Sequence, residues 1–556
     1  MLMLENRQVE EQWQLDLDYS GENNFASFFR SNGVIHSYPA KAVPEMVNSL
    51  ITKIKESFEI NTVLDPFVGS GTVAVEAKYM GLDFYGSDLN PLSILLSRTK
   101  TLTMNNGSYI EKQLRSFSIE VSQNYQPLHV QGIEHFNNIS YWFKEDNIKQ
   151  LSYIKSCISD FLKRKRGTSR ETFALILLTA FSTTIRSSSL TRNGEFKLYR
   201  ISPMEISNFS VNSIELFQKK IEDLLDLLEH TKDAFTNETK AEFRLANAKS
   251  LSYLKNKTID LVITSPPYGD SQSTVAYGQF SRLSIQWMQD LLKKYLSIDV
   301  YADNCDEYLL GGNKSEILEN SSGIISNSKT LSLLDEELKS VVTSETKKII
   351  DLKNCVAILL INSNLDMLIK ALENDELFKL IKERIRLDIY RKLNSKANLP
   401  TKKIKEIAKK SADRFMSQLS ALKGSRRYRK MEIIKSKLPF INETLERRVE
   451  SQPERYDEII KFFRDLYSVV KETDRVLASG GVQAWIVGHR TVLGKVTINL
   501  MGVLQDWFEN LGYRKITSLN RQYSFKRLPH HINSTITRND EIKTMMQEYI
   551  LVVQKK

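Results

Sequence analysis

Four residues near the middle of the chain combine a hydroxyl, two prolines and an aromatic ring. Ser265, Pro266, Pro267 and Tyr268 follow Thr264, at the end of residues 259–263, which have the apolar pattern of a buried strand. Two consecutive prolines fix the backbone and present carbonyl groups without N–H groups. The hydroxyl of Ser265 and the carbonyl of Pro266 therefore form a rigid acceptor pair that suits the two hydrogens of an exocyclic amine.

The ring of Tyr268 offers a flat face on which a base that has left its duplex can stack. The pattern predicts direct attack by a base amine on an electrophile, with no covalent intermediate on the protein. The alternative is a polyproline turn or partner-binding motif, which is typical of disordered tracts rather than of the end of a buried strand.

A second cluster lies about 200 residues earlier, where a predicted strand at 61–65 leads into a glycine turn and a helix. Gly69 and Gly71 allow the backbone to approach a ligand closely, and the helix that follows presents free N–H groups. Asp88 ends the next predicted strand, about 20 residues further on, where a carboxylate can accept ribose hydroxyls. Alternatively, Asp88 caps the helix that begins near Pro91. The turn lacks the third glycine of GxGxxG, which disfavours a nicotinamide enzyme.

These two clusters together resemble the amino-group DNA methyltransferases. Residues 65–72, DPFVGSGT, resemble motif I of that family, and residues 264–268, TSPPY, resemble its catalytic motif IV in the cytosine-N4 type. Residues 36–41 resemble motif X, and residues 243–250 resemble motif III. Residues 474–488 are predicted to form a helix end, a glycine turn at 474–481 and a strand, which resemble a later part of the fold, and residues 523–529 with 548–553 resemble its terminal hairpin.

The resemblance implies S-adenosylmethionine as cofactor and assigns two sets of residues. The catalytic set is Ser265, Pro266, Pro267 and Tyr268. The cofactor-binding set comprises Tyr38, Pro39, Lys41, Asp65, Pro66, Phe67, Gly69, Gly71, Thr72, Asp88, Asn247 and Thr264. In this assignment Asp65 and the glycine turn lie near the methionine part of the cofactor, Lys41 pairs with its carboxylate, Asp88 binds the ribose, and Asn247 approaches the adenine.

The resemblance further implies methylation of a flipped-out base in double-stranded DNA, as the modification part of a restriction-modification system with a cognate restriction endonuclease. Ser265 favours cytosine N4, because Asp is commoner before Pro-Pro-Tyr in adenine-N6 enzymes. Adenine-N6 transfer and, less favoured, transfer to an RNA base amine remain alternatives. A cytosine-C5 enzyme needs a cysteine nucleophile beside a proline, and Cys157, Cys305 and Cys355 have no such neighbour.

The elements that must position these residues predict an α/β fold, a Rossmann-like methyltransferase sheet with two large, mainly helical insertions. The predicted units are catalytic parts at 1–104, 241–294 and 456–556, a helical insertion at 105–240, and a basic helical insertion at 295–455 that is the candidate target-recognition domain.

Charge is concentrated in the second insertion. Residues 377–437 hold twenty Lys and Arg against five Asp and Glu, a net charge of +15 in a chain whose total is +11. Arg426, Arg427, Arg429 and Lys430 suit phosphate contacts, and this predicts DNA binding. The alternative is a solvated helical surface.

Three further expectations concern the rest of the chain. Residues 186–194 form a polar loop that either contacts phosphates or caps a helix. The widely spaced cysteines suggest no disulfide framework or metal site. Without a signal peptide or an apolar run that could cross a bilayer, the sequence predicts a cytoplasmic protein that binds no membrane.

Overall fold

The structure is a computed structural model. It describes residues 13, 15, 36–39, 42–103, 107–192, 197–231, 234–235, 238–269, 276–300, 305–312, 322–362, 365–396, 401–418, 424–522 and 547–556.

The described residues form a seven-stranded, mainly parallel sheet with the order β3-β2-β1-β4-β5-β9-β8. The strands are β1 (Thr62–Asp65), β2 (Asp83–Asp88), β3 (Ala241–Leu245), β4 (Ile259–Thr264), β5 (Leu477–Gly488), β8 (Arg514–Gln522) and β9 (Gln547–Gln554). Only β9 runs against its neighbours, β5 and β8. A separate hairpin consists of β6 (Arg490–Val492) and β7 (Val496–Ile498). The predicted α/β class is confirmed.

Alternate residues of the central strands point to opposite faces of the sheet and into two different apolar cores. Val63 and Ile263 lie in one core, whereas Leu64 and Val262 lie in the other. This alternation is the period of two that extended backbone imposes. A strand covered on both faces must be apolar along its whole length, which explains the continuous apolar runs in the sequence.

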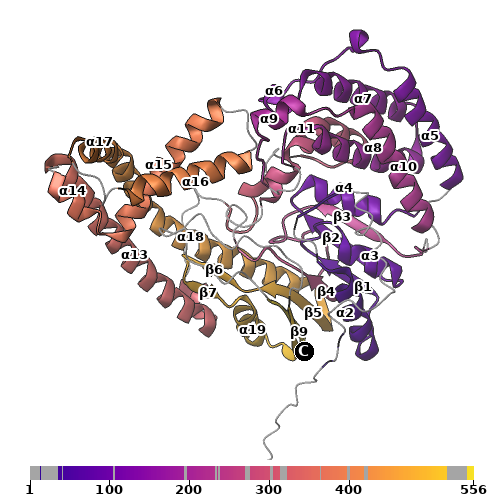
Figure 1. Ribbon diagram of the computed structural model, residues 1–556. Coiled ribbons are helices and arrows are strands. Elements are labelled where there is room, and N and C mark those ends of the chain that lie inside the picture. The colour runs from indigo at the N-terminus through magenta and orange to yellow at the C-terminus, as the bar shows by residue number, and fades with distance from the viewer. Residues whose placement is uncertain are drawn as a thin grey trace, which may run out of the picture.

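The first core is covered by helices from the N-terminal half of the chain. These are α2 (Pro44–Ser57), α3 (Thr72–Tyr79), α4 (Pro91–Lys100), α5 (Gly107–Gln123), α6 (Ile139–Trp142), α7 (Glu145–Lys163), α8 (Gly167–Ser188), α10 (Ser213–Thr231) and α11 (Tyr277–Leu296). The same part of the chain forms α9 (Pro203–Asn208) and the short 3₁₀ turns η1 (Pro127–His129) and η2 (Cys305–Glu307), which contribute no residue to this core. Residues from α5, α7, α8 and α10 share one continuous core with α2–α4, so the helices of 105–240 extend the sheet's own core (Figure 1).

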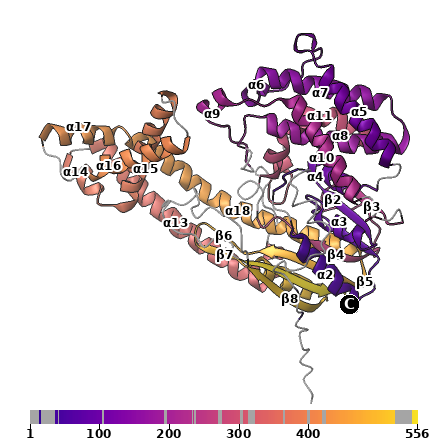
Figure 2. The ribbon, with the colours of Figure 1, turned by 45° about the vertical axis from the view of Figure 1, so that its right-hand side comes forward.

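The second core lies under α12 (Ser322–Ser326), the beginning of α13 (Lys329–Asn362), the end of α18 (Leu438–Val476), and α19 (Leu500–Asn510). α13 and α18 pack side by side and lead away from the sheet, as Figures 1 and 2 show. The boundary predicted between 455 and 456 lies inside α18, which is a continuous helix of 39 residues with Pro453 in it.

A third core lies at the far end of these two helices. It joins the end of α13 and the start of α18 with α14 (Leu365–Ala371), α15 (Asp375–Lys396), α16 (Thr401–Ser417) and α17 (Gly424–Lys435). We call residues 349–449 the basic lobe. Because its apolar side chains pack on one another rather than on the sheet, this lobe has a core of its own. Figure 2 shows its helices at the end of α13 and α18 that lies away from the sheet.

The turn predicted at 474–481 differs in the structure. We expected a helix end, a glycine turn and then a strand, but α18 ends at Val476 and β5 begins at Leu477. Gly480, with a φ of +79°, lies inside β5, where the register against β4 shifts. Glycine is used here for a bulge that positive φ permits, rather than for a turn.

Candidate functional site

The predicted site residues meet at the carboxyl ends of the parallel strands. Asp65, Asp88 and Thr264 are the last residues of β1, β2 and β4, and Asn247 follows the end of β3 by two residues. β1 lies between β2 and β4, so the strand order reverses there. Ligands of open α/β sheets bind at such a reversal, outside the carboxyl ends of the strands.

The glycine turn after β1 needs its glycines. Gly69 and Gly71 have φ values of +52° and +80°, in the left-handed region that side chains avoid. A Cβ added to Gly71 would lie 2.8 Å from Oγ of Ser97. The N–H of Gly69 donates to Asp88 Oδ2 (2.9 Å), and its carbonyl accepts from the hydroxyl of Ser93 (2.6 Å). The turn is thus fixed against both β2 and α4.

The hydrogen bonds of Asp88 exclude one of the two roles that the sequence left open, the capping of α4. Asn90, not Asp88, caps α4, because its side chain accepts from the N–H of Leu92. Asp88 instead accepts from the N–H groups of Gly69 and Asn90 and from the hydroxyl of Ser93, at 2.8–2.9 Å. A carboxylate offers about four acceptor positions. Most of these positions on Asp88 are therefore used by groups of its own loop and of the glycine turn.

Burial raises the pKa of Asp88, while its hydrogen bonds from Asn90, Ser93 and Gly69 oppose the shift. Burial raises the pKa of Asp65 further, to about 7, with Asp88 adding to the rise. Oδ1 of Asp65 accepts from the hydroxyl of Thr264 (2.7 Å) and from the N–H of Phe67 (3.0 Å), which links β1 to β4. Thr264 is fully buried.

The remaining predicted residues of the turn lie beside these carboxylates. The carbonyl of Pro66 accepts from Ser87, the half-buried ring of Phe67 packs against the second core, and Thr72 is the first residue of α3.

The N-terminal segment brings one aromatic residue to the same place. Tyr38 is 5% exposed, and its hydroxyl accepts from the side chain of Asn90 (3.1 Å). A Cβ on Gly69 would lie 3.8 Å from its ring. His36 bonds to Ser182 on α8 and packs edge-on against Phe280. Pro39 follows in the described chain, whereas Lys41 lies outside the described residues.

The loop after β4 carries the predicted catalytic residues. Oγ of Ser265 lies 3.2 Å from the hydroxyl of Tyr268, which donates to Oε1 of Glu548 (3.1 Å). Burial and the charge of Glu548 raise the pKa of Tyr268 well above its ordinary value. Pro266 is buried and Pro267 half-buried. The guanidinium of Arg490, from the β6–β7 hairpin, lies where a side chain on Gly269 would be.

Glu548 is held in turn by Arg521, with 2.6 Å between Nη1 of Arg521 and Oε2 of Glu548. Both side chains are buried, at 6% and 4% exposure. They face one another because β8 and β9 pair in antiparallel register, Arg521 opposite Glu548. Neither Arg521 nor Glu548 was among the residues predicted for the site. The only signal, a single acid ahead of the apolar run 549–553, does not indicate a partner.

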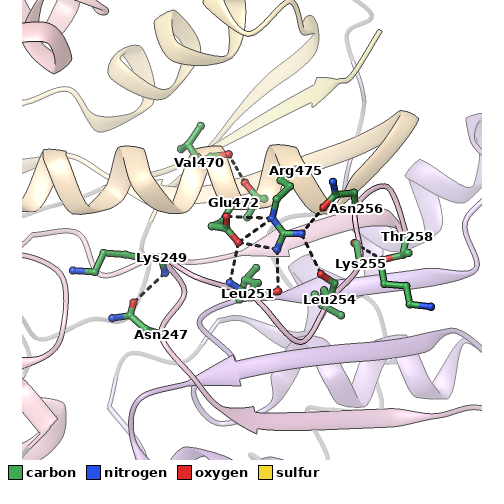
Figure 3. Close-up of polar contacts among 11 residues, drawn as sticks. Asn247, Lys249, Leu251, Leu254, Lys255, Asn256, Thr258, Val470, Glu472 and Arg475 are labelled. Carbon is green, nitrogen blue, oxygen red and sulfur yellow. Dashed lines mark hydrogen bonds and ion pairs between the residues drawn. The ribbon is translucent and has the colours of Figure 1, made fainter.

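The loop that carries Asn247 is tied to α18, as Figure 3 shows. Oδ1 of Asn247 accepts from the N–H of Lys249 (3.0 Å). Further along, Arg475 donates to the carbonyls of Leu251 and Leu254, and Glu472 accepts from the N–H of Leu251 (2.9 Å). The end of α18 therefore fixes the connection between β3 and β4.

The loop at 186–192 is packed into the protein. Arg186 is 8% exposed, its guanidinium lies 3.9 Å from the centre of the Phe280 ring, and burial lowers its pKa to about 10. The hydroxyl of Ser189 donates to the carbonyl of Arg186 (2.7 Å). Arg186 and Ser189 thus fit the capping alternative, whereas residues 193 and 194 of the predicted loop lie outside the described residues.

The basic lobe exposes its charges on helices that are amphipathic. α16 buries Ile404, Ala408, Ala412 and Met416, four residues apart, and exposes basic side chains between them, namely Lys403, Lys405, Lys409, Lys410 and Arg414.

On α17, Arg429 is exposed, whereas Lys430 donates to Phe415 and Gln418 and so ties α17 to α16. Arg426 and Arg427 belong to α17, but their side chains lie outside the described ones. Among the described residues, no helix is both long and apolar enough to span a bilayer.

Comparison with known proteins agrees with this geometry. Residues 6–96, which include the glycine turn and Asp88, match a family described as DNA methylase, of the N6 and N4 type. The chain is 34% identical to the type II methyltransferase M.MvaI of Kocuria varians over 319 residues, 54% of this chain and 67% of that protein. It is 24% identical to M.BsoBI of Geobacillus stearothermophilus over 255 residues, 40% and 47% of the two chains. No solved structure matches significantly.

The sheet order and the cluster at its carboxyl edge are those of the Rossmann-like methyltransferase fold. The chain belongs to the amino-group DNA methyltransferases, the family of type II enzymes that methylate an exocyclic base amine. The resemblance is thereby confirmed at the level of the family, while the assignment of residues 264–268 to its motif IV stays a prediction.

Proposed function

We propose that the chain transfers a methyl group from S-adenosylmethionine to the N4 amine of cytosine in double-stranded DNA. The observation that carries this proposal is the position of the Ser265 hydroxyl beside Tyr268, at the sheet edge that also holds Asp65 and Asp88. A neutral hydroxyl, rather than a carboxylate, stands before Pro266 and Pro267.

The residues at this edge fit the cofactor. Gly69 and Gly71, both at positive φ, bring backbone without side chains to this edge, and two buried carboxylates with raised pKa values suit a ligand that carries positive charge. Tyr38, Asp65, Gly69 and Gly71 would hold the methionine part, and Asp88 the ribose. When bound, S-adenosylmethionine supplies an electrophilic methyl group on a sulfonium.

On the substrate side, Ser265 Oγ and the carbonyl of Pro266 accept the two hydrogens of the target amine and turn its lone pair toward the methyl carbon. The ring of Tyr268 stacks on the flipped-out base. An N–C bond forms as an S–C bond breaks, the sulfur becomes a neutral thioether, and the methylated amine loses one proton to water.

Binding of the duplex falls to the basic lobe in this proposal. Exposed Lys and Arg on α16 and α17 contact phosphates, which favours its role as the target-recognition domain of the 295–455 insertion. The enzyme acts in the cytoplasm and protects DNA from a cognate restriction endonuclease.

The test is mass spectrometry of nucleosides from DNA incubated with the protein and S-adenosylmethionine, beside a parallel reaction on RNA. We expect N4-methylcytosine in DNA and no methylated base in RNA. N6-methyladenine without N4-methylcytosine would overturn the base assignment and leave the amine-transfer mechanism in place.

A further inference from the structure

The hydroxyl of Tyr268 lies in a chain of polar groups that ends in a buried ion pair. It is 3.2 Å from Ser265 Oγ on one side and 3.1 Å from Glu548 Oε1 on the other, and Glu548 Oε2 lies 2.6 Å from Arg521 Nη1. The first two residues belong to the loop after β4, and the last two to strands β9 and β8. A pair of charges buried to this degree costs free energy of desolvation, so its position beside the catalytic loop calls for an explanation.

The hydrogen bonds among these polar groups can be donated in only one direction. Glu548, as a carboxylate paired with Arg521, has acceptor positions only, and Tyr268 has a single hydroxyl hydrogen. That hydrogen is given to Glu548. The contact between Ser265 and Tyr268 must then be made with the hydroxyl hydrogen of Ser265. The lone pairs of Ser265 Oγ consequently point away from Tyr268.

We propose that Arg521 and Glu548 are positioning residues that act through Tyr268 to fix Ser265 as a hydrogen-bond acceptor for the target amine. Without this chain, the serine hydroxyl can rotate and offer its hydrogen to the amine nitrogen, which would occupy the lone pair that attacks. With these contacts in place, each hydrogen bond polarises the next. The negative charge of Glu548, two hydrogen bonds from Ser265, then makes Ser265 Oγ a stronger acceptor. The inference rests on the proposed role of Ser265 in amine transfer.

The inference also gives Tyr268 two separable functions, since its ring stacks on the base while its hydroxyl transmits orientation. Tyr268→Phe keeps the ring and the Arg521–Glu548 pair, and removes only the link. Glu548→Gln no longer fixes the direction in which Tyr268 and Ser265 donate their hydrogens, because an amide can donate as well as accept. Glu548→Gln also leaves the buried Arg521 without its counter-charge, so the thermal stability of this variant must be measured together with its activity. Tyr268→Phe avoids that complication and is therefore the principal variant.

The experiment is a double-mutant cycle on single-turnover methyl transfer with the full chain, at saturating DNA and S-adenosylmethionine. We expect Tyr268→Phe to slow transfer by about 10-fold to 100-fold, with unchanged dissociation constants for cofactor and DNA. In a Ser265→Ala background the same change should cost nothing further, because the group that it orients is gone. Tyr549→Phe is the matched control, since its hydroxyl bonds to Gln547 on the same strand, and it should keep the parent rate.

If Tyr268→Phe slows transfer by the same factor in the parent and in the Ser265→Ala background, so that the two losses of rate multiply, the inference is wrong. Glu548 and Arg521 would then only support the β8–β9 pair. A full rate for Tyr268→Phe beside a slow Ser265→Ala would overturn it too, while the proposed function stands. A full rate for Ser265→Ala would instead remove the proposed role of Ser265, and the inference with it.

Discussion

The carboxyl edge of the sheet and the basic lobe use charge in opposite ways. At the edge, Asp65 is 4% exposed and bonded within the chain, and Glu548 is paired with Arg521 out of contact with water. On α16 most of the exposed charges are basic, and an acidic residue, Glu406, is paired with Lys410 among them. Buried, paired groups fix atoms in place, which methyl transfer requires. Exposed charges attract at a distance and are screened by salt, which suits binding to a polymer of phosphates.

One continuous helix, α18, connects the two regions. α18 begins in the core of the basic lobe and ends with Glu472 and Arg475, which bond to the loop between β3 and β4 (Figure 3). The comparison therefore predicts that changes at the edge alter the rate or cofactor affinity, and that changes on the lobe alter DNA affinity and its salt dependence.

The largest effect is expected for Ser265→Ala. Loss of the acceptor hydroxyl should lower the rate of methyl transfer by about 100-fold or more, while cofactor and DNA affinities stay near those of the parent. Single-turnover kinetics with separate binding measurements test this. Ser252→Ala, an exposed serine in the β3–β4 loop, is the control that should leave all three quantities unchanged.

Asp88→Ala should weaken binding of S-adenosylmethionine by about 10-fold to 100-fold, because it removes an acceptor and frees the N–H of Gly69. Calorimetry measures the affinity. Asp83 occupies the other end of β2, where it accepts from the N–H of Lys240, so Asp83→Ala should bind cofactor normally. Equal affinity of Asp88→Ala and the parent would exclude a direct role for this carboxylate.

Reversal of Lys403, Lys405 and Lys409 to Glu should weaken DNA binding and flatten the plot of log affinity against log salt by about 0.9 per lost phosphate contact. The catalytic rate at saturating DNA should persist. The same reversal of three exposed residues of the first helical region, Lys112, Arg166 and Lys219, controls for net charge. If both triple variants showed the same salt slope, the lobe would be an ordinary solvated surface.

The smallest effect concerns pH. The pKa of Asp65 is raised from 3.8 to about 7 by burial, so in the folded protein the protonated form is favoured. Its contribution to stability is complete below about pH 4 and is lost as the pH rises through about 7. A positively charged ligand favours the ionised form, so cofactor affinity should rise about tenfold from pH 6 to pH 8.

Calorimetry in buffers of different ionisation enthalpy would detect the proton that Asp65 releases on binding. Asp65→Asn should flatten the pH dependence of cofactor affinity. A parent affinity that does not change between pH 6 and pH 8 would show that this carboxylate does not sense the cofactor.

Local sequence was sufficient for the parts of the site that are made locally. β1, the glycine turn and β2 follow one another within 30 residues, and the sequence predicts each from apolar periodicity and from Gly69 and Gly71. The placement of Asp88 at a strand end could be predicted, but not that Asn90 would cap the next helix, because two polar residues, two positions apart, compete for that role.

Contacts between strands far apart in the sequence could not be predicted. Glu548 approaches Tyr268 only because β9 enters the sheet between β5 and β8 with a particular register, and nothing near residue 548 encodes that register. The boundary at 455 fell inside α18 because a change in charge along a helix is no reason for the helix to end. The packing of Arg186 on Phe280 depends likewise on tertiary contacts between α8 and α11.

The place of β9 also sets the order in which the protein can fold. β9 lies between β5 and β8 in the sheet but follows both in the chain, so during synthesis the edge of β5 stays open until residues 547–554 have emerged from the ribosome. An open edge of apolar strands is a template for wrong pairing, and contacts between distant residues form slowly. Newly made chains should therefore pass through a stage at which they need protection by chaperones, and they acquire a complete catalytic loop only when that stage ends.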